Sequence, residues 1–194
     1  MKSLIQNIFV STVFKKNLND KIYKNYFLKK LKSCKKSVVV SNVGGFQSES
    51  LIEVETNILH HIFLNPAYEF AKELNPRQEI NLKLLNYWLN LNKTNNYNEF
   101  HNHQGFLSGI YYIKTPKNSG RLVFQEGNLT KMSTNYYKYF DNPNFYTKFT
   151  VNPQEGDLYL FTSNTLHYVE PNLSKKDRIS VAFNLGVQTY SKGD

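Results

Sequence analysis

His101 and His103, separated by a single residue, are the side chains whose types and spacing most directly suggest chemistry. Residues i and i+2 of a β-strand project from the same face, so a strand or its end would bring both imidazoles to one side. Two neutral imidazoles can bind one metal ion, and a third ligand must then come from elsewhere in the fold. The remaining histidines are His60, His61 and His167, of which the first two lie in a predicted helix.

Arg178 is the second residue that stands out, because the chain has three arginines against twenty-one lysines. A guanidinium is suited to a bidentate grip on a carboxylate. The segment alternates between a polar face (Arg178, Ser180, Ala182, Asn184) and an apolar face (Ile179, Val181, Phe183, Leu185). This pattern predicts a strand whose polar side lines the mouth of a barrel, where a small anionic ligand could bind. The alternative role for Arg178 is a structural ion pair with Asp157 or Asp177.

The elements that must position these side chains are mostly short strands separated by Gly, Pro, Asn and Asp. We expect strands at 80–92, 106–114, 120–125, 144–151, 156–163 and 178–187. Before them we expect a strand at 5–14, a helix at 20–34 capped by Asp20, a strand at 37–42, a loop at 44–50 and a mainly helical segment at 51–74, broken or kinked at Pro66. The fold class is therefore mainly β with flanking helices (α+β), and a jelly roll fits best.

The length of 194 residues and the 40% hydrophobic content predict one folded domain over 1–194, with a helical N-terminal part at about 1–75 and a jelly-roll core at about 80–190. The single cysteine, Cys34, excludes an internal disulfide and is typical of a reducing compartment. We find neither a secretory signal nor an apolar run long enough for a membrane helix, so we expect a cytoplasmic protein with no membrane partner.

The positive charge is concentrated near the N-terminus. Residues 1–40 contain ten lysines and one acidic residue, whereas the remaining residues contain fourteen basic and fourteen acidic ones. Such a segment fits an acidic partner, including nucleic acid. We favour a solvent-exposed helix face instead, because arginine is absent there and aromatic residues are few.

The order His101-x-His103, then His167, then Arg178-x-Ser180 resembles the 2-oxoglutarate/Fe(II)-dependent oxygenases, which are double-stranded β-helix (jelly-roll, cupin-like) enzymes. The stretches "FHNHQGFLSGIYYIKTPKNSGRLVFQ" and "GDLYLFTSNTLHYVEPNLSKKDRISVAFN" look like an uncharacterised bacterial and phage branch of that superfamily. The N-terminal "NIFVSTVF" and "SNVGGFQS" are also similar to that branch. The resemblance covers most of the chain, and its specific motifs lie between residues 98 and 186.

The sequence departs from the superfamily pattern at His103, where a carboxylate ligand is usual. Replacing a carboxylate by a neutral imidazole raises the net charge of the site by one. Three interpretations follow. All three histidines bind iron, or His103 only supports a site completed by a carboxylate such as Glu126, or the site is degenerate. We favour the first, because alternation places His103 beside His101 and nothing comparable positions Glu126.

The resemblance implies Fe(II), O₂ and 2-oxoglutarate as cosubstrate, with His101, His103 and His167 as metal ligands. Arg178 and Ser180 would bind the 5-carboxylate, with Asn90 and Tyr112 as further contacts in the cavity. The implied reaction couples decarboxylation of 2-oxoglutarate to hydroxylation of a small-molecule or peptide substrate. The alternatives are a cupin-like three-histidine dioxygenase that does not use 2-oxoglutarate and a non-catalytic jelly-roll binding protein. The sequence predicts neither the identity of the substrate nor the oligomeric state.

Overall fold

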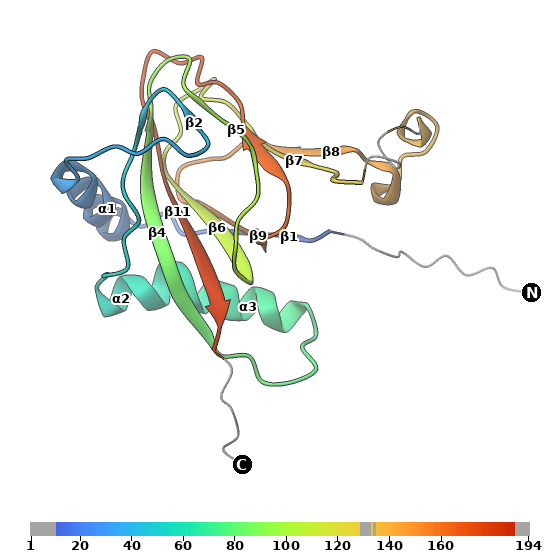
Figure 1. The fold of residues 1–194 in the computed structure, drawn as a ribbon, viewed down its shortest axis with the longest axis horizontal. Coiled ribbons are helices and arrows are strands. Elements are labelled where there is room, and N and C mark those ends of the chain that lie inside the picture. Colours follow the sequence, from blue (N-terminus) through green and yellow to red (C-terminus); the bar gives the residue numbers. More distant parts are fainter. Residues whose placement is uncertain (1–10, 129–132, 134, 189–194) are drawn as a thin grey trace, which may run out of the picture.

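A computed structural model describes residues 11–128, 133 and 135–188 of the chain. The strands of these residues form two antiparallel sheets (Figure 1). The larger sheet has the order β1 (Val13–Asn17), β9 (Asp157–Thr162), β6 (Leu107–Lys114), β11 (Arg178–Val187), β4 (Leu82–Asn92) and β3 (Phe46–Gln47). The smaller sheet has the order β2 (Asn42–Val43), β5 (Tyr97–His101), β10 (His167–Val169), β7 (Leu122–Gln125) and β8 (Lys148–Val151). This architecture confirms the predicted jelly roll.

The helices cover the outer face of the larger sheet, where α3 crosses behind β4 and β11 in Figure 1. They are α1 (Lys21–Ser33), α2 (Thr56–Ile58), the π-helical η1 (Leu59–Leu64) and α3 (Asn65–Glu73). Phe27 of α1 packs on Phe63 of η1 and on Tyr87 of β4, with ring centroids 6.1 and 6.4 Å away. Asp20 caps α1 as expected, since its carboxylate accepts the Ile22 amide at 2.6 Å.

Pro66 does not end the helical segment at 51–74. It lies in the first turn of α3, where a missing amide hydrogen is tolerated. The preceding turn is π-helical, with the Asn65 amide donating to the carbonyl of His60 five residues earlier. In a π-turn the backbone amides donate to the carbonyl five residues earlier and not to the one four residues earlier. The regular hydrogen bond that a proline cannot make is therefore not needed here, and the helix continues through Pro66.

The alternation predicted for β11 is confirmed. Its odd-numbered residues are buried against the helices, while Arg178 and Ser180 face the space between the sheets. Ser180 lies opposite Asn90 of β4 on one side and Tyr112 of β6 on the other. Because directly paired residues share a face of the sheet, these three side chains form one row across the inner surface.

The predicted strands of the core are present, with ends trimmed by up to four residues. The prediction at 5–14 is wrong in its bounds: β1 begins at Val13, and residues 5–10 lie outside the described part of the chain. The prediction at 37–42 is also wrong, since Ser37 forms only an isolated bridge to Ser48. Strands β5 and β10 were not among the predicted strands, because they are short and not apolar throughout.

The predicted loop at 44–50 instead includes β3 and links the two sheets. The preceding strand β2 pairs with β5 of the smaller sheet, and β3 pairs with β4 of the larger one. The turn between them uses Gly44 and Gly45 at φ values of 67° and 72°, a conformation that glycine adopts without strain. The β2–β3 connection therefore crosses from one sheet to the other next to the inner cavity.

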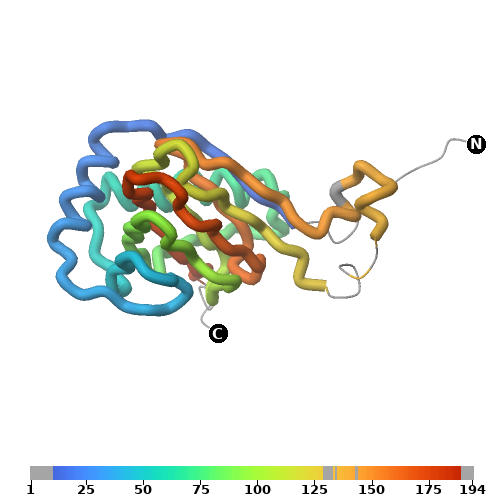
Figure 2. The backbone as a smooth tube through the Cα atoms, turned by 90° about the horizontal axis from the view of Figure 1, so that it is seen from above, coloured from blue at the N-terminus to red at the C-terminus, as the bar shows by residue number. Residues whose placement is uncertain are grey.

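A second connection, between β7 and β8, projects away from the body (Figures 1 and 2). It contains the short helices η2 (Tyr136–Lys138) and η3 (Pro143–Phe145).

The lysines near the N-terminus are partly neutralised by acidic residues from elsewhere in the fold. Lys15 pairs with Asp157 at 2.9 Å, Lys24 with Glu155 at 3.2 Å and Lys36 with Glu49 at 2.7 Å, and Lys16 also pairs with Glu69.

Candidate metal and cosubstrate site

A cavity of about 470 Å³, including the part open to solvent, lies between the two sheets. Strands β4, β6, β9 and β11 form one wall, and β5, β7 and β10 form the other. The lining residues are Ser41, Trp88, Asn90, Asn92, Asn98, His101, His103, Gly109, Ile110, Tyr112, Leu122, Phe161, His167, Val169, Arg178, Ser180 and Ala182. All seven side chains predicted from the sequence to bind the metal or cosubstrate are therefore in one cavity.

The three histidines His101, His103 and His167 converge at one end of this cavity. One ring nitrogen from each lies within 4.8 Å of the others, and these are the described residues that could together hold a metal ion. His101 is the last residue of β5 and lies directly opposite His167, the first residue of β10. Their ring centroids are 4.3 Å apart, and His103 is 4.9 Å from His101.

Backbone carbonyls orient two of the imidazoles. Nδ1 of His101 donates to the Glu99 carbonyl at 2.6 Å, and Nδ1 of His167 donates to the Thr165 carbonyl at 2.9 Å. A proton held on Nδ1 leaves the lone pair on Nε2, which is the form that binds a metal. The donor set therefore fits a divalent transition metal such as Fe(II).

Burial also keeps these imidazoles neutral. It lowers the pKa of His103 to about 4 and that of His167 to about 3, with a smaller contribution from the neighbouring His101. Burial likewise lowers the pKa of His101, against the opposing effect of its hydrogen bond to Glu99. A metal ion at this site therefore competes with few protons near neutral pH.

His103 lies two residues beyond β5, in the connection to β6, and not on a strand. Its amide donates to the Ser163 carbonyl at 2.8 Å, which fixes this connection against the end of β9. Trp88 of β4 lines the cavity, with its ring centroid 5.4 Å from that of His103. Glu126 accepts the Asn128 amide and is not part of the metal-binding group.

Arg178 lies at the other end of the cavity and is 1% exposed. Its Nη1 donates to the carbonyls of Ser119 and, at 3.0 Å, of Glu170. The second terminal nitrogen, Nη2, is buried without a hydrogen-bond partner among the described residues. Burial lowers the pKa of the guanidinium, which nevertheless stays charged.

The expected alternative for Arg178, an ion pair with Asp157 or Asp177, is not found among the described residues. Asp157 interacts instead with Lys15 at 2.9 Å and with Asn17 at 2.9 Å. The guanidinium charge consequently has no acidic partner among the residues that the structure describes, and Arg178 lines the cavity.

The inner row of polar residues beside Arg178 is also incompletely hydrogen-bonded. Tyr112 Oη and Asn90 Oδ1 are buried and have no hydrogen-bond partner in the described part of the chain, and the same holds for Oε1 of Gln47, which pairs in register with Asn90. Burial raises the pKa of the Tyr112 hydroxyl, so this group remains a neutral donor. Since unsatisfied buried polar groups are costly, such a concentration indicates that a ligand completes these hydrogen bonds.

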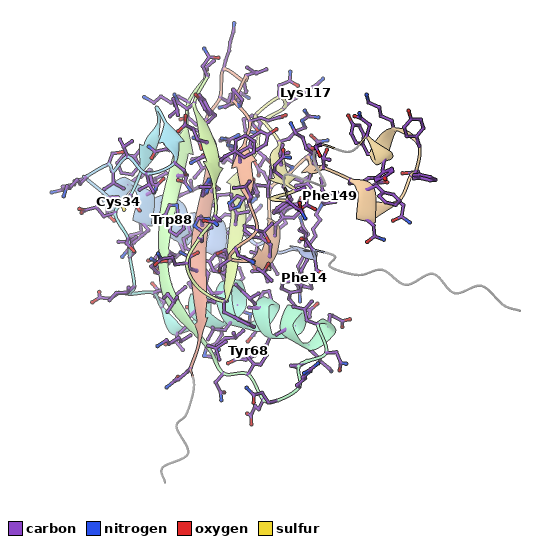
Figure 3. The ribbon with its side chains drawn as sticks, turned by 45° about the vertical axis from the view of Figure 1, so that its right-hand side comes forward. Phe14, Cys34, Tyr68, Trp88, Lys117 and Phe149 are labelled. Carbon is purple, nitrogen blue, oxygen red and sulfur yellow. The ribbon has the colours of Figure 1, made fainter. Side chains whose placement is uncertain are left out.

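Several residues around the site were not predicted from the sequence. Gln47 belongs to β3, where it pairs with Asn90, whereas Ser41 precedes β2 and Asn98 belongs to β5. Apolar side chains of Ile110, Phe161 and other residues complete the walls of the cavity. The period-2 pattern of "SNVGGFQS" is too short to have predicted two strands, although its two adjacent glycines were a signal for a tight turn. The side chains of this region are drawn in Figure 3, where Trp88 is labelled on β4.

A jelly roll with a histidine cluster at one end of its inner cavity and an unpaired arginine at the other defines a class of metal-dependent oxygenase. A family model described as "Putative 2OG-Fe(II) oxygenase" matches residues 86–184, and the chain belongs to this family. The protein is thus a 2-oxoglutarate-dependent Fe(II) oxygenase. Family membership favours this function over the predicted alternatives of a cupin-like enzyme without 2-oxoglutarate and a non-catalytic binding protein.

Solved structures share the fold at low sequence identity. HygX from Streptomyces hygroscopicus with nickel and 2-oxoglutarate bound has a TM-score of 0.62 at 12% identity, covering 91% of this chain and 83% of HygX. A Pseudomonas putida prolyl-4-hydroxylase has a TM-score of 0.59 at 10% identity, covering 92% and 93% of the two chains. The viral collagen prolyl hydroxylase vCPH from Paramecium Bursaria Chlorella virus-1 has a TM-score of 0.54 at 12% identity, covering 89% and 94%.

No curated protein matches the chain significantly in sequence. Among the described residues, none of the helices has the length and apolar character needed to cross a membrane.

Proposed function

We propose that His101, His103 and His167 bind the iron, and that Arg178 binds the 5-carboxylate of 2-oxoglutarate with help from Ser180, Tyr112 and Asn90. We further propose that the enzyme is a hydroxylase of a small-molecule or peptide substrate. The observation that carries this proposal is the buried, unpartnered Nη2 of Arg178, in the same cavity as three convergent imidazoles.

The contacts support a division of the cavity between metal and cosubstrate. A 2-oxoglutarate molecule has one carboxylate and a keto group that can chelate a metal, and a second carboxylate at its far end. Arg178 Nη2 and Tyr112 Oη offer two donors to that second carboxylate, and the Ser180 hydroxyl lies in the same row. Ile110, Leu122 and other apolar residues exclude water from the middle of the cavity.

When bound, iron(II) and 2-oxoglutarate together supply the activation of O₂. The residues of the chain hold and orient these reactants. His101 and His167 are held by the Glu99 and Thr165 carbonyls, and Arg178 is held by the Ser119 and Glu170 carbonyls, so both ends of the cosubstrate would be fixed by rigid groups.

Hydroxylation is the outcome that we expect for the substrate. Two of the structures that share the fold are named as prolyl hydroxylases, but others are named as a carbocyclase and an epimerase. Fold likeness alone therefore does not choose the reaction. A screen of amino acids, peptides and small molecules should give succinate together with a product that is one oxygen atom heavier. Succinate coupled only to ring closure or epimerisation would refute the hydroxylase assignment.

The ligand set is tested by iron content. His103→Ala should lose most of its bound iron(II), because one of three ligands is removed, whereas Glu126→Ala should keep it. The wild-type protein with iron(II) and 2-oxoglutarate under anaerobic conditions should show a weak visible charge-transfer band, and His103→Ala should not. Loss of iron from the Glu126 variant alone would assign the third ligand to that carboxylate.

A further inference from the structure

Charge balance in the cavity distinguishes this site from one with a carboxylate ligand. Iron(II) brings two positive charges, three neutral imidazoles bring none, and Arg178 adds one. The 2-oxoglutarate dianion compensates two of these three charges, so the loaded site keeps one positive charge. If a carboxylate replaced His103, the same site would be neutral.

The described part of the protein offers no acidic group to balance this charge. No residue that lines the cavity is acidic. The buried carboxylate of Asp157 already interacts with Lys15 at 2.9 Å and does not line the cavity. An uncompensated charge in a partly enclosed cavity attracts anions strongly, because the interior screens charge less than water does.

A chain of hydrogen bonds runs from the His103 backbone to the side chain of Asn86 on β4. The Ser163 carbonyl accepts the His103 amide, and the Ser163 and Ser108 hydroxyls are 2.8 Å apart. Ser108 donates to Asn184 Oδ1 at 2.8 Å, and Asn184 Nδ2 donates to Asn86 Oδ1 at 3.0 Å. With its oxygen occupied in this way, the half-buried Asn86 presents its Nδ2 as a donor, and none of the described residues accepts from it.

Asn86 lies two residues before Trp88 on β4, so the two side chains share the inner face of the larger sheet. The Trp88 ring lies 5.4 Å from that of His103. The unoccupied donor and the excess positive charge are therefore on the same side of the cavity.

We propose that the substrate carries an anionic oxygen group, such as a carboxylate, which binds beside His103 between Trp88 and Asn86. This inference rests on the proposed function, since it requires three imidazole ligands. The substrate class is then an organic acid or another small molecule with an acidic group close to the carbon that reacts. The anionic group supplies the negative charge that a carboxylate ligand supplies in sites that have one. It also accepts a hydrogen bond from Asn86 Nδ2.

The test uses the full-length protein loaded with cobalt(II) in place of iron and saturated with 2-oxoglutarate, so that Arg178 is occupied. Acetate is the anionic probe, and acetamide is its neutral control of the same shape. Binding is followed by the visible cobalt spectrum, and retention of 2-oxoglutarate is checked by equilibrium dialysis. Acetate should bind at least tenfold more tightly than acetamide.

Two variants locate the effect. His103→Asp neutralises the excess charge. This variant should bind acetate at least tenfold more weakly than the wild-type protein while it retains cobalt and 2-oxoglutarate. Asn86→Asp replaces the donor by a negative charge and changes no metal ligand. This variant should also bind acetate at least tenfold more weakly. Asn57→Asp, at an exposed position of α2 on the outer face of the larger sheet, serves as the matched control and should leave acetate binding unchanged.

Equal affinities for acetate and acetamide, or an Asn86→Asp variant with unchanged acetate affinity, would overturn the inference. Failure of the wild-type protein to bind cobalt, or of 2-oxoglutarate to change its spectrum, would instead refute the proposed function. The two failures are therefore distinguishable in one set of titrations.

Discussion

Replacing Tyr112 by Phe should stabilise the ligand-free protein and weaken its binding of 2-oxoglutarate. The Tyr112 hydroxyl is buried and has no hydrogen-bond partner among the described residues. An unsatisfied buried polar group costs about 1–3 kcal/mol, so its removal should raise the free energy of unfolding by about 1 kcal/mol after a small loss of packing. A hydrogen bond to a carboxylate contributes about 1.5–3 kcal/mol, so the Kd for 2-oxoglutarate should rise roughly 10- to 150-fold.

The neighbouring Tyr111 provides the matched control. It faces the helices, and its hydroxyl donates to the Leu18 carbonyl at 3.0 Å. Tyr111→Phe should therefore lose about 1 kcal/mol of stability and leave the Kd for 2-oxoglutarate unchanged. Urea unfolding of the metal-free variants and calorimetric titration of the metal-loaded ones measure both quantities. A Tyr112→Phe protein with unchanged affinity for 2-oxoglutarate would refute the role assigned to this hydroxyl.

Two further predictions concern the ends of the cavity. Because the pKa values of His103 and His167 are lowered to about 4 and about 3, the unfolded chain takes up protons first as the pH falls below 6.5. Urea unfolding of the metal-free protein should show stability falling from about pH 6.5 towards pH 4, and a flat profile would contradict the burial of these imidazoles. At the other end, an added Cβ at Gly120 would lie 2.7 Å from Arg178 Nη1 and 2.2 Å from a backbone carbonyl. Gly120→Ala should cost about 1–3 kcal/mol of stability and weaken 2-oxoglutarate binding in titration, whereas Gly127→Ala, with open space around its Cβ, should change neither.

Period-2 alternation predicted the parts of the fold in which one face is buried. In β11 the apolar residues pack on the helices and the polar ones face the cavity. The alternation in the sequence therefore predicts which face of the sheet each side chain of this strand occupies. The short strands β2, β3, β5 and β10 could not be predicted in this way. Strands of two to five residues depend on pairing partners that are distant in the chain, and "HYV" of β10 shows no pattern by itself.

The parts of the candidate site that could be predicted are those marked by a rare residue type or by two residues of one type at close spacing. His101 and His103 are separated by one residue in the sequence, and Arg178 is one of three arginines. The sequence did not predict that Trp88 lines the cavity, because an aromatic residue on a predicted strand is more often in the core. Gln47 was missed because its place in the inner row depends on pairing with Asn90, forty-three residues downstream.

The connection between β2 and β3 has a consequence for the motion of the two sheets at this edge. Since β2 is hydrogen-bonded to one sheet and β3 to the other, the connection ties the sheets together. Moving the sheets apart here would break bonds such as those from the Glu99 amide to the Ser41 carbonyl and from the Ser48 amide to the Leu89 carbonyl. These amides should therefore exchange slowly with deuterium, and the cavity wall that contains Ser41 should stay in place on the same timescale.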